Sequence, residues 1–174
     1  MKINNVNVEK IKQFLEEVKE NSDKAKKSKK IEGEWDFNEN RSQFKSKIEF
    51  QNGSMEILAD SPEFMGGSGV APDPIQYCLF GLASCYAATF ASIASEKGIK
   101  LSKLKVTAEN KVNLSMTLGL SKESIVEEVK LVLEVKSDSD KKEIEEAEKL
   151  ANERCPGVYC LTNPIRLVTE VKIE

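Results

Sequence analysis

Histidine is absent from the 174-residue sequence, and this absence excludes more chemistry than any other feature of the composition. Without an imidazole there is no Ser-His-Asp triad, no Cys-His nucleophile pair and no zinc site built on histidine. A cysteine that acts as a nucleophile in this chain therefore has to be activated by another group.

The cysteine motifs that usually signal redox or zinc sites are also missing. The four cysteines form two pairs, Cys78 with Cys85 and Cys155 with Cys160, spaced by seven and five residues. Neither a CxxC motif nor zinc-ribbon spacing is present, so we expect no structural zinc and no metal site. On an ideal helix Cys78 and Cys85 lie on nearly the same face but about 10 Å apart along the axis, which is too far for a disulfide. A redox partner for either cysteine is therefore expected in the second pair.

The N-terminus lacks the apolar core of a secretion signal, and the net charge of -3 gives no general attraction to nucleic acid or to an anionic membrane. We therefore expect a cytoplasmic protein with reduced cysteines, since thiols stay free in a reducing compartment. The length suits one soluble globular domain. Five lysines within residues 24–30 are interpreted as a solvated linker, and nucleic-acid binding through them is the less favoured alternative.

The most informative feature that is present is a long apolar segment from Asp73 to Gly98, which we predict to be one helix. Asp73 can cap its first amides, Pro74 fits its first position and Gly98 suits the residue just past its end. No charged side chain occurs between Pro74 and Ser95, and apolar or small residues cover every face, which is typical of a helix surrounded by protein. A transmembrane span is the less favoured alternative, because charged amphipathic flanks supply surface to wrap the helix.

The flanking segments predict an α+β fold in which antiparallel strands cover this central helix. Apolar residues at helical spacing indicate an amphipathic helix over residues 8–20, and a linker follows over 21–30. Residues 31–58 alternate and contain turn signals, so they are interpreted as a three-stranded meander whose first turn, 38–42, carries Arg41. The Gly- and Pro-rich stretch 61–73 is interpreted as a connector, because it lacks the lysine and spacing of a phosphate loop.

After the central helix, alternation predicts further strands and one more helix. A hairpin is expected around Glu109 and Asn110, and a strand over residues 125–136. Residues 137–140 offer caps for a second amphipathic helix that Pro156 ends, and a last strand is expected over 165–173.

Two motifs in this order resemble the signatures of the OsmC/Ohr family. The first is the loop GGSGVAPDP followed by LASCYAAT in the central helix, and the second is ERCPGVYCL, in which Leu161 follows Cys155 by six residues. The resemblance begins near Gly33 and continues to the end of the sequence. It implies an N-terminal helix and linker over residues 1–30 and an OsmC-like domain over 31–174.

The resemblance implies an OsmC-like fold with sheets wrapped around a long buried helix, in an intertwined homodimer. It also implies a thiol-dependent peroxidase that reduces organic hydroperoxides or hydrogen peroxide without a cofactor. Cys85 matches the peroxidatic cysteine, which would become a sulfenic acid, and Cys155 matches the resolving cysteine, which would condense with it to a disulfide. An external dithiol would then regenerate the pair, and for organic-hydroperoxide members this reductant is a lipoylated protein.

Burial alone would keep the Cys85 thiol protonated, so the mechanism needs a cation near its sulfur. Arg41 is the candidate, because the family places an arginine in the first hairpin and Arg41 is the only arginine before Cys85; an exposed turn arginine is the alternative. Ile75 stands where peroxidase members carry a glutamate that pairs with this arginine. That departure favours a second hypothesis, a non-enzymatic OsmC-like stress protein that binds a small hydrophobic ligand in the dimer-interface pocket.

The remaining cysteines leave two alternatives open. Cys78 is interpreted as a small buried apolar residue of the central helix. Cys160 is an alternative resolving cysteine, because both cysteines are expected in one short loop. Cys155 could also be a helix-end residue without a redox role, but its position directly before a proline at a helix end leads us to expect that it is exposed. The family resemblance favours Cys155 over Cys160 as the resolving cysteine.

Overall fold

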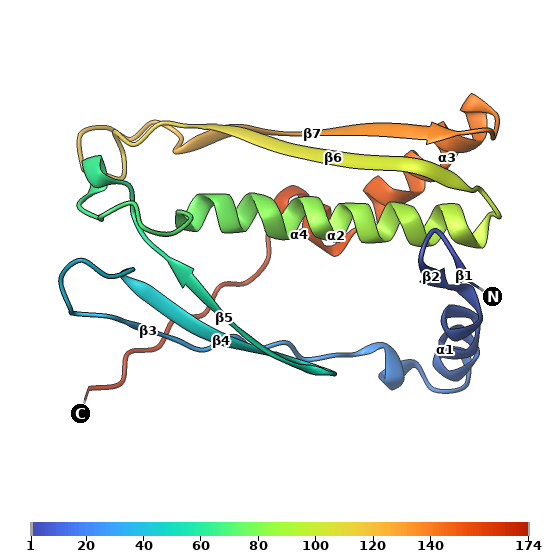
Figure 1. Cartoon of the computed structure of the whole chain (residues 1–174), viewed down its shortest axis with the longest axis horizontal. Coiled ribbons are helices and arrows are strands. Elements are labelled where there is room, and N and C mark those ends of the chain that lie inside the picture. The colour runs from blue at the N-terminus through green and yellow to red at the C-terminus, as the bar shows by residue number, and fades with distance from the viewer. Residues whose placement is uncertain (1, 174) are drawn as a thin grey trace. The chain divides into compact units, whose positions relative to one another are not determined.

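The computed structural model describes residues 2–173, which form two compact units (Figure 1). One unit consists of the described residues up to Lys10 together with those from Gly81 onward, and the other is Ile11–Phe80. Helix α2 (Pro74–Glu96) is continuous across residue 80, so it contributes to both units.

The first unit is built on a long antiparallel hairpin that runs alongside α2 (Figure 1). Its strands are β6 (Leu101–Val112) and β7 (Val126–Ser137), and it is followed by helix α3 (Lys141–Arg154). The hydrophobic core lies where α2 meets the hairpin and α3, and its fully buried members include Tyr86, Phe90, Ala94, Ala147 and Ala151. The predicted second helix is confirmed, because the Asp140 side chain caps α3 by accepting from the amide of Lys142.

Both ends of α2 are where the sequence predicts them. The Asp73 Oδ1 atom accepts hydrogen bonds from the amides of Ile75 and Gln76, at 2.7 and 3.0 Å, and so satisfies two free donors of the first turn. Gly98 has a φ of 77°, the left-handed conformation that lets the chain leave a helix without a Cβ clash.

The expectation that α2 is surrounded by protein on every face is not met in the single chain. Its buried residues all lie between Leu82 and Ser95, whereas Phe80 is 70% exposed. The physical reason is that β6, β7 and α3 cover one face only. The helix is long and apolar enough to cross a membrane, and 28% of its most apolar 18-residue window is buried. On the covered face, apolar side chains of α2 pack against β6, β7 and α3, which explains why that face is apolar.

A small N-terminal hairpin, which the sequence analysis did not identify, packs on the C-terminal end of α2. Strands β1 (Lys2–Ile3) and β2 (Val6–Asn7) are joined by two asparagines with positive φ. The side chain of the first, Asn4, donates to Ser95 Oγ and to the Ile99 carbonyl and accepts from the Leu101 amide. Local Asn-Asn turn chemistry and these three hydrogen bonds fix the hairpin on the helix end.

The second unit contains the predicted three-stranded meander, which is confirmed. Strands β3 (Gly33–Trp35), β4 (Phe44–Phe50) and β5 (Gly53–Ala59) pair in that order, all antiparallel. A 3-10 turn, η2 (Glu63–Met65), lies in the connector to α2. Helix α1 (Val8–Glu20) agrees with the predicted amphipathic helix, and the linker after it contains one 3-10 turn, η1 (Ser22–Ala25).

The hairpin expected at Glu109 and Asn110 is wrong. Strand β6 continues through both residues, which pair with Lys130 and Val129 of β7. The chain turns instead between Asn113 and Ile125, where the Asn113 amide donates to the Ile125 carbonyl over 2.8 Å. Gly119, with a φ of 73°, is a left-handed residue within this connection.

The strand expected over residues 165–173 is also wrong, and an extra helix precedes this segment. Pro156 does not merely end α3; it begins α4 (Pro156–Thr162), because proline fits the first position of a helix. The described residues 163–173 contain no strand, and Leu167 and Ile173 are exposed. Alternation is not sufficient for a strand, because a strand needs a neighbour to satisfy its backbone groups.

Candidate functional site

The first unit brings together the two cysteines of the sequence motifs. Cys85 lies in the middle of α2, and Cys155 occupies the junction between α3 and α4. Their sulfur atoms are 3.6 Å apart, with the Cys155 thiol donating to Cys85, and both cysteines are free thiols. Because an S–S bond is about 2.05 Å long, a small movement would be enough to join them.

Small residues on α3 bring Cys155 to this position. Ala147 and Ala151 are both fully buried, and with Cys155 they form a stripe at spacing i, i+4, i+8 that faces the α2 core. The Cys155 amide also donates to the Ala151 carbonyl, so Cys155 extends the last turn of α3. The exposed fraction of Cys155 is 0%, and the expectation that it would be exposed is therefore wrong. The alanine stripe was the sequence signal for its burial.

Tyr86, the neighbour of Cys85, holds α3 against α2 by polar contacts. Its hydroxyl lies 3.1 Å from Asn152 Oδ1 and 3.3 Å from Glu148 Oε1, and Asn152 itself donates to Glu148. Burial chiefly, and then the Glu148 carboxylate, raises the pKa of the Tyr86 hydroxyl, so it stays protonated and acts as a donor. The sequence analysis missed this residue because its two partners come from a distant helix.

Helix α4 contacts the Cys85 sulfur through a glycine. The amide of Gly157 donates a hydrogen bond to Cys85, which favours the thiolate. A Cβ on Gly157 would lie 3.2 Å from Leu82 Cδ1, 3.5 Å from Cys85 Cβ and 3.6 Å from Cys85 Sγ. Glycine at this position therefore permits the close approach of α4 to α2.

The pKa of the Cys85 thiol nevertheless lies above its ordinary value. Burial is the largest cause, and the neighbouring Cys155 and Cys160 add to it, while the Gly157 amide opposes the rise. Cys85 is therefore protonated at neutral pH in the chain as described, and a thiolate at this position requires a further positive group.

The other two cysteines are both exposed. Cys78 lies on the N-terminal part of α2 and is exposed, so its interpretation as a buried apolar residue is wrong. The cause is the partial cover of α2, which leaves that part of the helix open. Cys160 is exposed on α4, in a helix and not in a loop.

Arg41 lies in the exposed connection between β3 and β4 of the second unit. It contributes to lowering the pKa of Asp36, although hydrogen bonds from Asn38 are the largest cause and Lys45 contributes more than Arg41 does. The pairing of Arg41 with Cys85 stays a prediction. Ile75 is in the first turn of α2, where its amide binds Asp73.

Asp60 is a residue of the second unit that the sequence analysis missed. Its Oδ2 atom accepts from the amides of Ser68 and Val70, at 3.0 and 3.1 Å, and so fixes the conformation of the glycine loop ahead of α2. Only 1% of Asp60 is exposed, and its Oδ1 atom has no hydrogen-bond partner within residues 2–173. The Val70 amide is the largest cause that lowers the pKa of this carboxyl.

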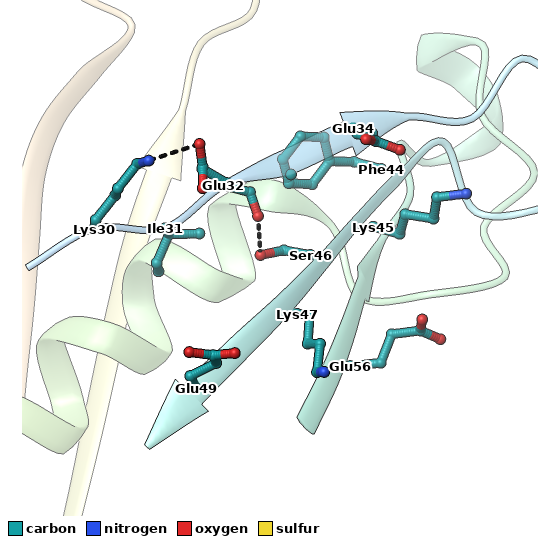
Figure 2. Close-up of a pocket in the computed structure, with 11 residues that line it drawn as sticks. Lys30, Ile31, Glu32, Glu34, Phe44, Lys45, Ser46, Lys47, Glu49 and Glu56 are labelled. Carbon is teal, nitrogen blue, oxygen red and sulfur yellow. Dashed lines mark hydrogen bonds and ion pairs between the residues drawn. The ribbon is translucent and has the colours of Figure 1, made fainter. Parts of the chain in front are cut away.

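A hollow of about 1140 Å³ lies on the three-stranded sheet of the second unit (Figure 2). Its lining is rich in charge: Lys30 and Glu32 form an ion pair of 2.7 Å, and Ser46 donates to the Glu32 carbonyl. This lining differs from the apolar pocket that the ligand-binding hypothesis requires. No group of three or more Cys, Asp or Glu residues in the described part of the chain is placed to hold a metal ion.

Comparison with known proteins gives one family and a set of similar folds. The model of the OsmC-like protein family matches residues 66–170. An OsmC-like protein from Mycoplasma pneumoniae is 24% identical over 78% of this chain and 89% of that chain, with a TM-score of 0.58. An organic hydroperoxide resistance protein OsmC from Legionella pneumophila is 20% identical over 79% and 92%, with a TM-score of 0.53. An OsmC-like protein of unknown function from Vibrio cholerae is 20% identical over 76% and 92%, with a TM-score of 0.57.

These likenesses confirm the predicted OsmC-like fold, with antiparallel sheets and a long helix. No curated protein sequence matches the chain.

Proposed function

Because the chain belongs to the OsmC-like protein family, whose model matches more than half of it, we propose that it is a thiol-dependent peroxidase. Its substrates are organic hydroperoxides or hydrogen peroxide. The observation that carries this proposal is the 3.6 Å distance between the sulfur atoms of Cys85 and Cys155. One thiol is partly accessible and the other is fully buried beside it, which suits attack on a small peroxide followed by closure of a disulfide.

The proposed reaction has two steps in the protein. The Cys85 thiolate attacks one oxygen of the peroxide, the O–O bond breaks, and the other oxygen leaves as an alcohol or as water after taking a proton. The Cys85 sulfenic acid then reacts with the Cys155 thiol, which forms the disulfide and releases water. An external dithiol donates two electrons and returns both thiols.

The first step requires Cys85 as a thiolate. The Gly157 amide supplies one favourable hydrogen bond, but burial outweighs it, so the pKa of Cys85 remains raised. We assign the missing positive charge to Arg41, whose guanidinium would stabilise the thiolate and orient the peroxide oxygen. This assignment is supported by the position of Arg41 in the first connection of the meander, as the family resemblance implies.

The substrate and reductant follow from relatives. The Legionella protein is described as an organic hydroperoxide resistance protein, which supports an organic hydroperoxide as the substrate. We further propose a cytoplasmic location and a lipoylated protein as the dithiol, in line with the family resemblance.

A homodimer is part of the same proposal. Large apolar side chains remain exposed in both units, among them Trp35 and Phe37 in the second unit and Leu167 and Ile173 in the first. Exposed apolar area on this scale is typical of a surface that another chain covers. A second copy that packs on α2 would also supply the cover that the single chain leaves open.

The test is to add one equivalent of cumene hydroperoxide to the fully reduced protein and to map disulfides by non-reducing peptide mass spectrometry. The expected product is a Cys85–Cys155 bridge that forms within seconds to minutes, and Cys85→Ser abolishes it. Cys78→Ser is the matched control and retains the bridge. Persistence of all four thiols would contradict the proposal at its first step.

A second candidate function, binding of a small apolar ligand without turnover, is favoured by two features of the chain. The raised pKa of Cys85 leaves its thiol protonated, and Ile75 replaces the carboxylate that would position an arginine. In this case Cys85→Ser would leave binding of an apolar fluorescent probe unchanged, whereas no peroxide would be consumed by either protein.

A further inference from the structure

The buried position of Cys155 creates a problem for the reductive half of the proposed cycle. A disulfide between Cys85 and Cys155 would have one sulfur that is fully buried and one that is only partly accessible. Thiol–disulfide exchange depends on access of the attacking thiolate to a sulfur atom. An external dithiol would therefore reach this disulfide poorly.

Cys160 offers an exposed thiol close to the same pair. Gly157 and Cys160 are three residues apart in α4 and so share one side of that helix, about 4.5 Å apart along its axis. Gly157 is the residue of α4 that lies against Cys85. Consistent with this proximity, Cys160 is the smallest of the contributions that raise the pKa of Cys85.

The short helix that carries Cys160 is held weakly. Helix α4 spans only seven residues, contains no fully buried residue in the described chain, and has no side-chain hydrogen bond at its N-terminal cap. Its apolar attachment to the core is the partly buried Val158. Segments with few buried contacts open locally at low free-energy cost. Opening of α4 beyond Gly157 would give a short flexible segment that lets Cys160 reach Cys85. The ends of such a segment meet in well under a microsecond, so chain motion does not limit the exchange.

We propose that Cys160 is a third redox-active thiol, which takes over the disulfide from Cys155 and exposes it to the reductant. The inference rests on the proposed Cys85–Cys155 cycle and adds one exchange step to it. The Cys160 thiolate attacks Cys85 Sγ, the Cys85–Cys155 bond breaks, and Cys155 leaves as a thiolate that takes up the proton lost by Cys160. The two-electron oxidation stays within the protein, so no further oxidant is consumed.

Reduction then begins at the exposed sulfur. A thiolate of the external dithiol attacks Cys160 Sγ and releases Cys85, and the second thiol of the reductant displaces Cys160 as the reductant itself becomes a cyclic disulfide. Cys160 thus serves as the entry position for electrons from the external dithiol, and Cys155 protects the Cys85 sulfenic acid inside.

The first experiment uses the oxidant diamide, so that it does not depend on peroxide chemistry. The experiment compares three proteins that all carry Cys78→Ser: the single variant itself with its site intact, the protein with Cys155→Ser added, and the protein with both Cys155→Ser and Cys160→Ser added. Each is treated with one equivalent of diamide, alkylated and mapped by mass spectrometry. We expect a Cys85–Cys160 bridge in Cys155→Ser and its complete loss in the double variant. Free Cys85 and Cys160 in Cys155→Ser, beside a closed bridge in the intact site, would overturn the inference.

The second experiment measures reduction and remains decisive if Cys155→Ser does not fold. Cys160→Ser and the parent protein are oxidised to the Cys85–Cys155 bridge, and the return of free thiols is followed with excess dithiothreitol. We expect a several-fold slower return in Cys160→Ser, and equal rates would overturn the relay. If the Cys85–Cys155 bridge forms with diamide but not with cumene hydroperoxide, the peroxidase proposal is contradicted, while the disulfide relay is not.

Discussion

At the scale of single residues, Tyr86, the neighbour of Cys85 on α2, connects this helix to α3, the helix that Cys155 follows. Its hydroxyl is the polar link between α2 and the Glu148–Asn152 pair of α3. Buried apolar residues of both helices pack in the same core. Tyr86 therefore helps to position α3, and with it Cys155.

We predict that Tyr86→Phe lowers the free energy of unfolding by about 1 kcal/mol, which is the typical net value of one hydrogen bond. The loss stays small because Glu148 and Asn152 can turn toward water. Urea denaturation measures it, and Tyr159→Phe, at an exposed position, is the control with no expected change. A double-mutant cycle with Asn152→Ala should show coupling, and additive effects would argue against the contact.

Because of Asp60, the stability of the glycine loop ahead of α2 is expected to depend on pH. Hydrogen bonds from the loop amides hold the pKa of this carboxyl below its unfolded value. A carboxylate with a lowered folded pKa contributes stability that is fully present above the unfolded pKa, about 4, and that is lost as the pH falls through the folded pKa. The contribution therefore disappears in the acidic range and not near neutrality.

We predict that Asp60→Asn lowers the urea midpoint at pH 7, and that the difference from the parent protein shrinks progressively from about pH 4 downward. The measurement is a series of urea titrations between neutral and acidic pH. Asp138→Asn, which changes an exposed aspartate, is the control and should show no such convergence. A difference that is constant with pH would mean that the charge of Asp60 has no role.

At the scale of elements, we expect the approach of α4 to α2 to influence the proposed closure of the Cys85–Cys155 bridge. Two helical glycines in the first unit allow a matched comparison. A Cβ on Gly157 would be crowded by Leu82 Cδ1 at 3.2 Å and would touch Cys85 at ordinary contact distance, whereas a Cβ on Gly81 would meet no described atom within 4 Å. We therefore expect the same substitution to have different effects in the two helices.

We predict that Gly157→Ala slows closure of the Cys85–Cys155 bridge, because displacement of α4 weakens the amide hydrogen bond to Cys85 and moves Cys155. Gly81→Ala should leave closure unchanged and raise stability by about 0.5–1 kcal/mol, the usual gain from replacing glycine inside a helix. Thiol loss after mixing with peroxide measures the first effect, and urea denaturation the second. Equal closure rates in both variants would show that the contact of α4 has no influence.

At the scale of the whole molecule, the apolar length of α2 exceeds what one chain covers. Phe80 is the clearest case, since this large aromatic side chain in the N-terminal third of the apolar helix is mostly exposed. A helix that is apolar all round is normally enclosed. The proposed second copy of the chain accounts for this difference.

We predict that the protein has the mass of a dimer in solution and that Phe80→Glu shifts it toward the monomer, because the new charge would be buried at the interface without a partner. Sedimentation equilibrium measures both states. Leu120→Glu, in the connection between β6 and β7, is an exposed control and should remain dimeric. A monomeric parent protein would contradict the proposed assembly.

The sequence by itself determined the elements with strong local signals. The ends of α2 and the start of α3 follow from capping residues, and the meander follows from alternation interrupted by turn residues, because these signals act within a few residues of the backbone they control. The two cysteine motifs also indicated the family. They paired Cys85 with Cys155, and the structure brings these two thiols together, while their roles stay predictions.

Only the tertiary structure decided which faces are covered and where the strands end. Burial of Cys155, exposure of Cys78 and the contacts of Tyr86 and Asn4 depend on residues that are far away in the sequence. Alternation alone placed one turn at the wrong residues and one strand in the C-terminal tail, because a strand forms only where a neighbour pairs with it. Local patterns describe what a segment can bury, and packing determines what it does bury.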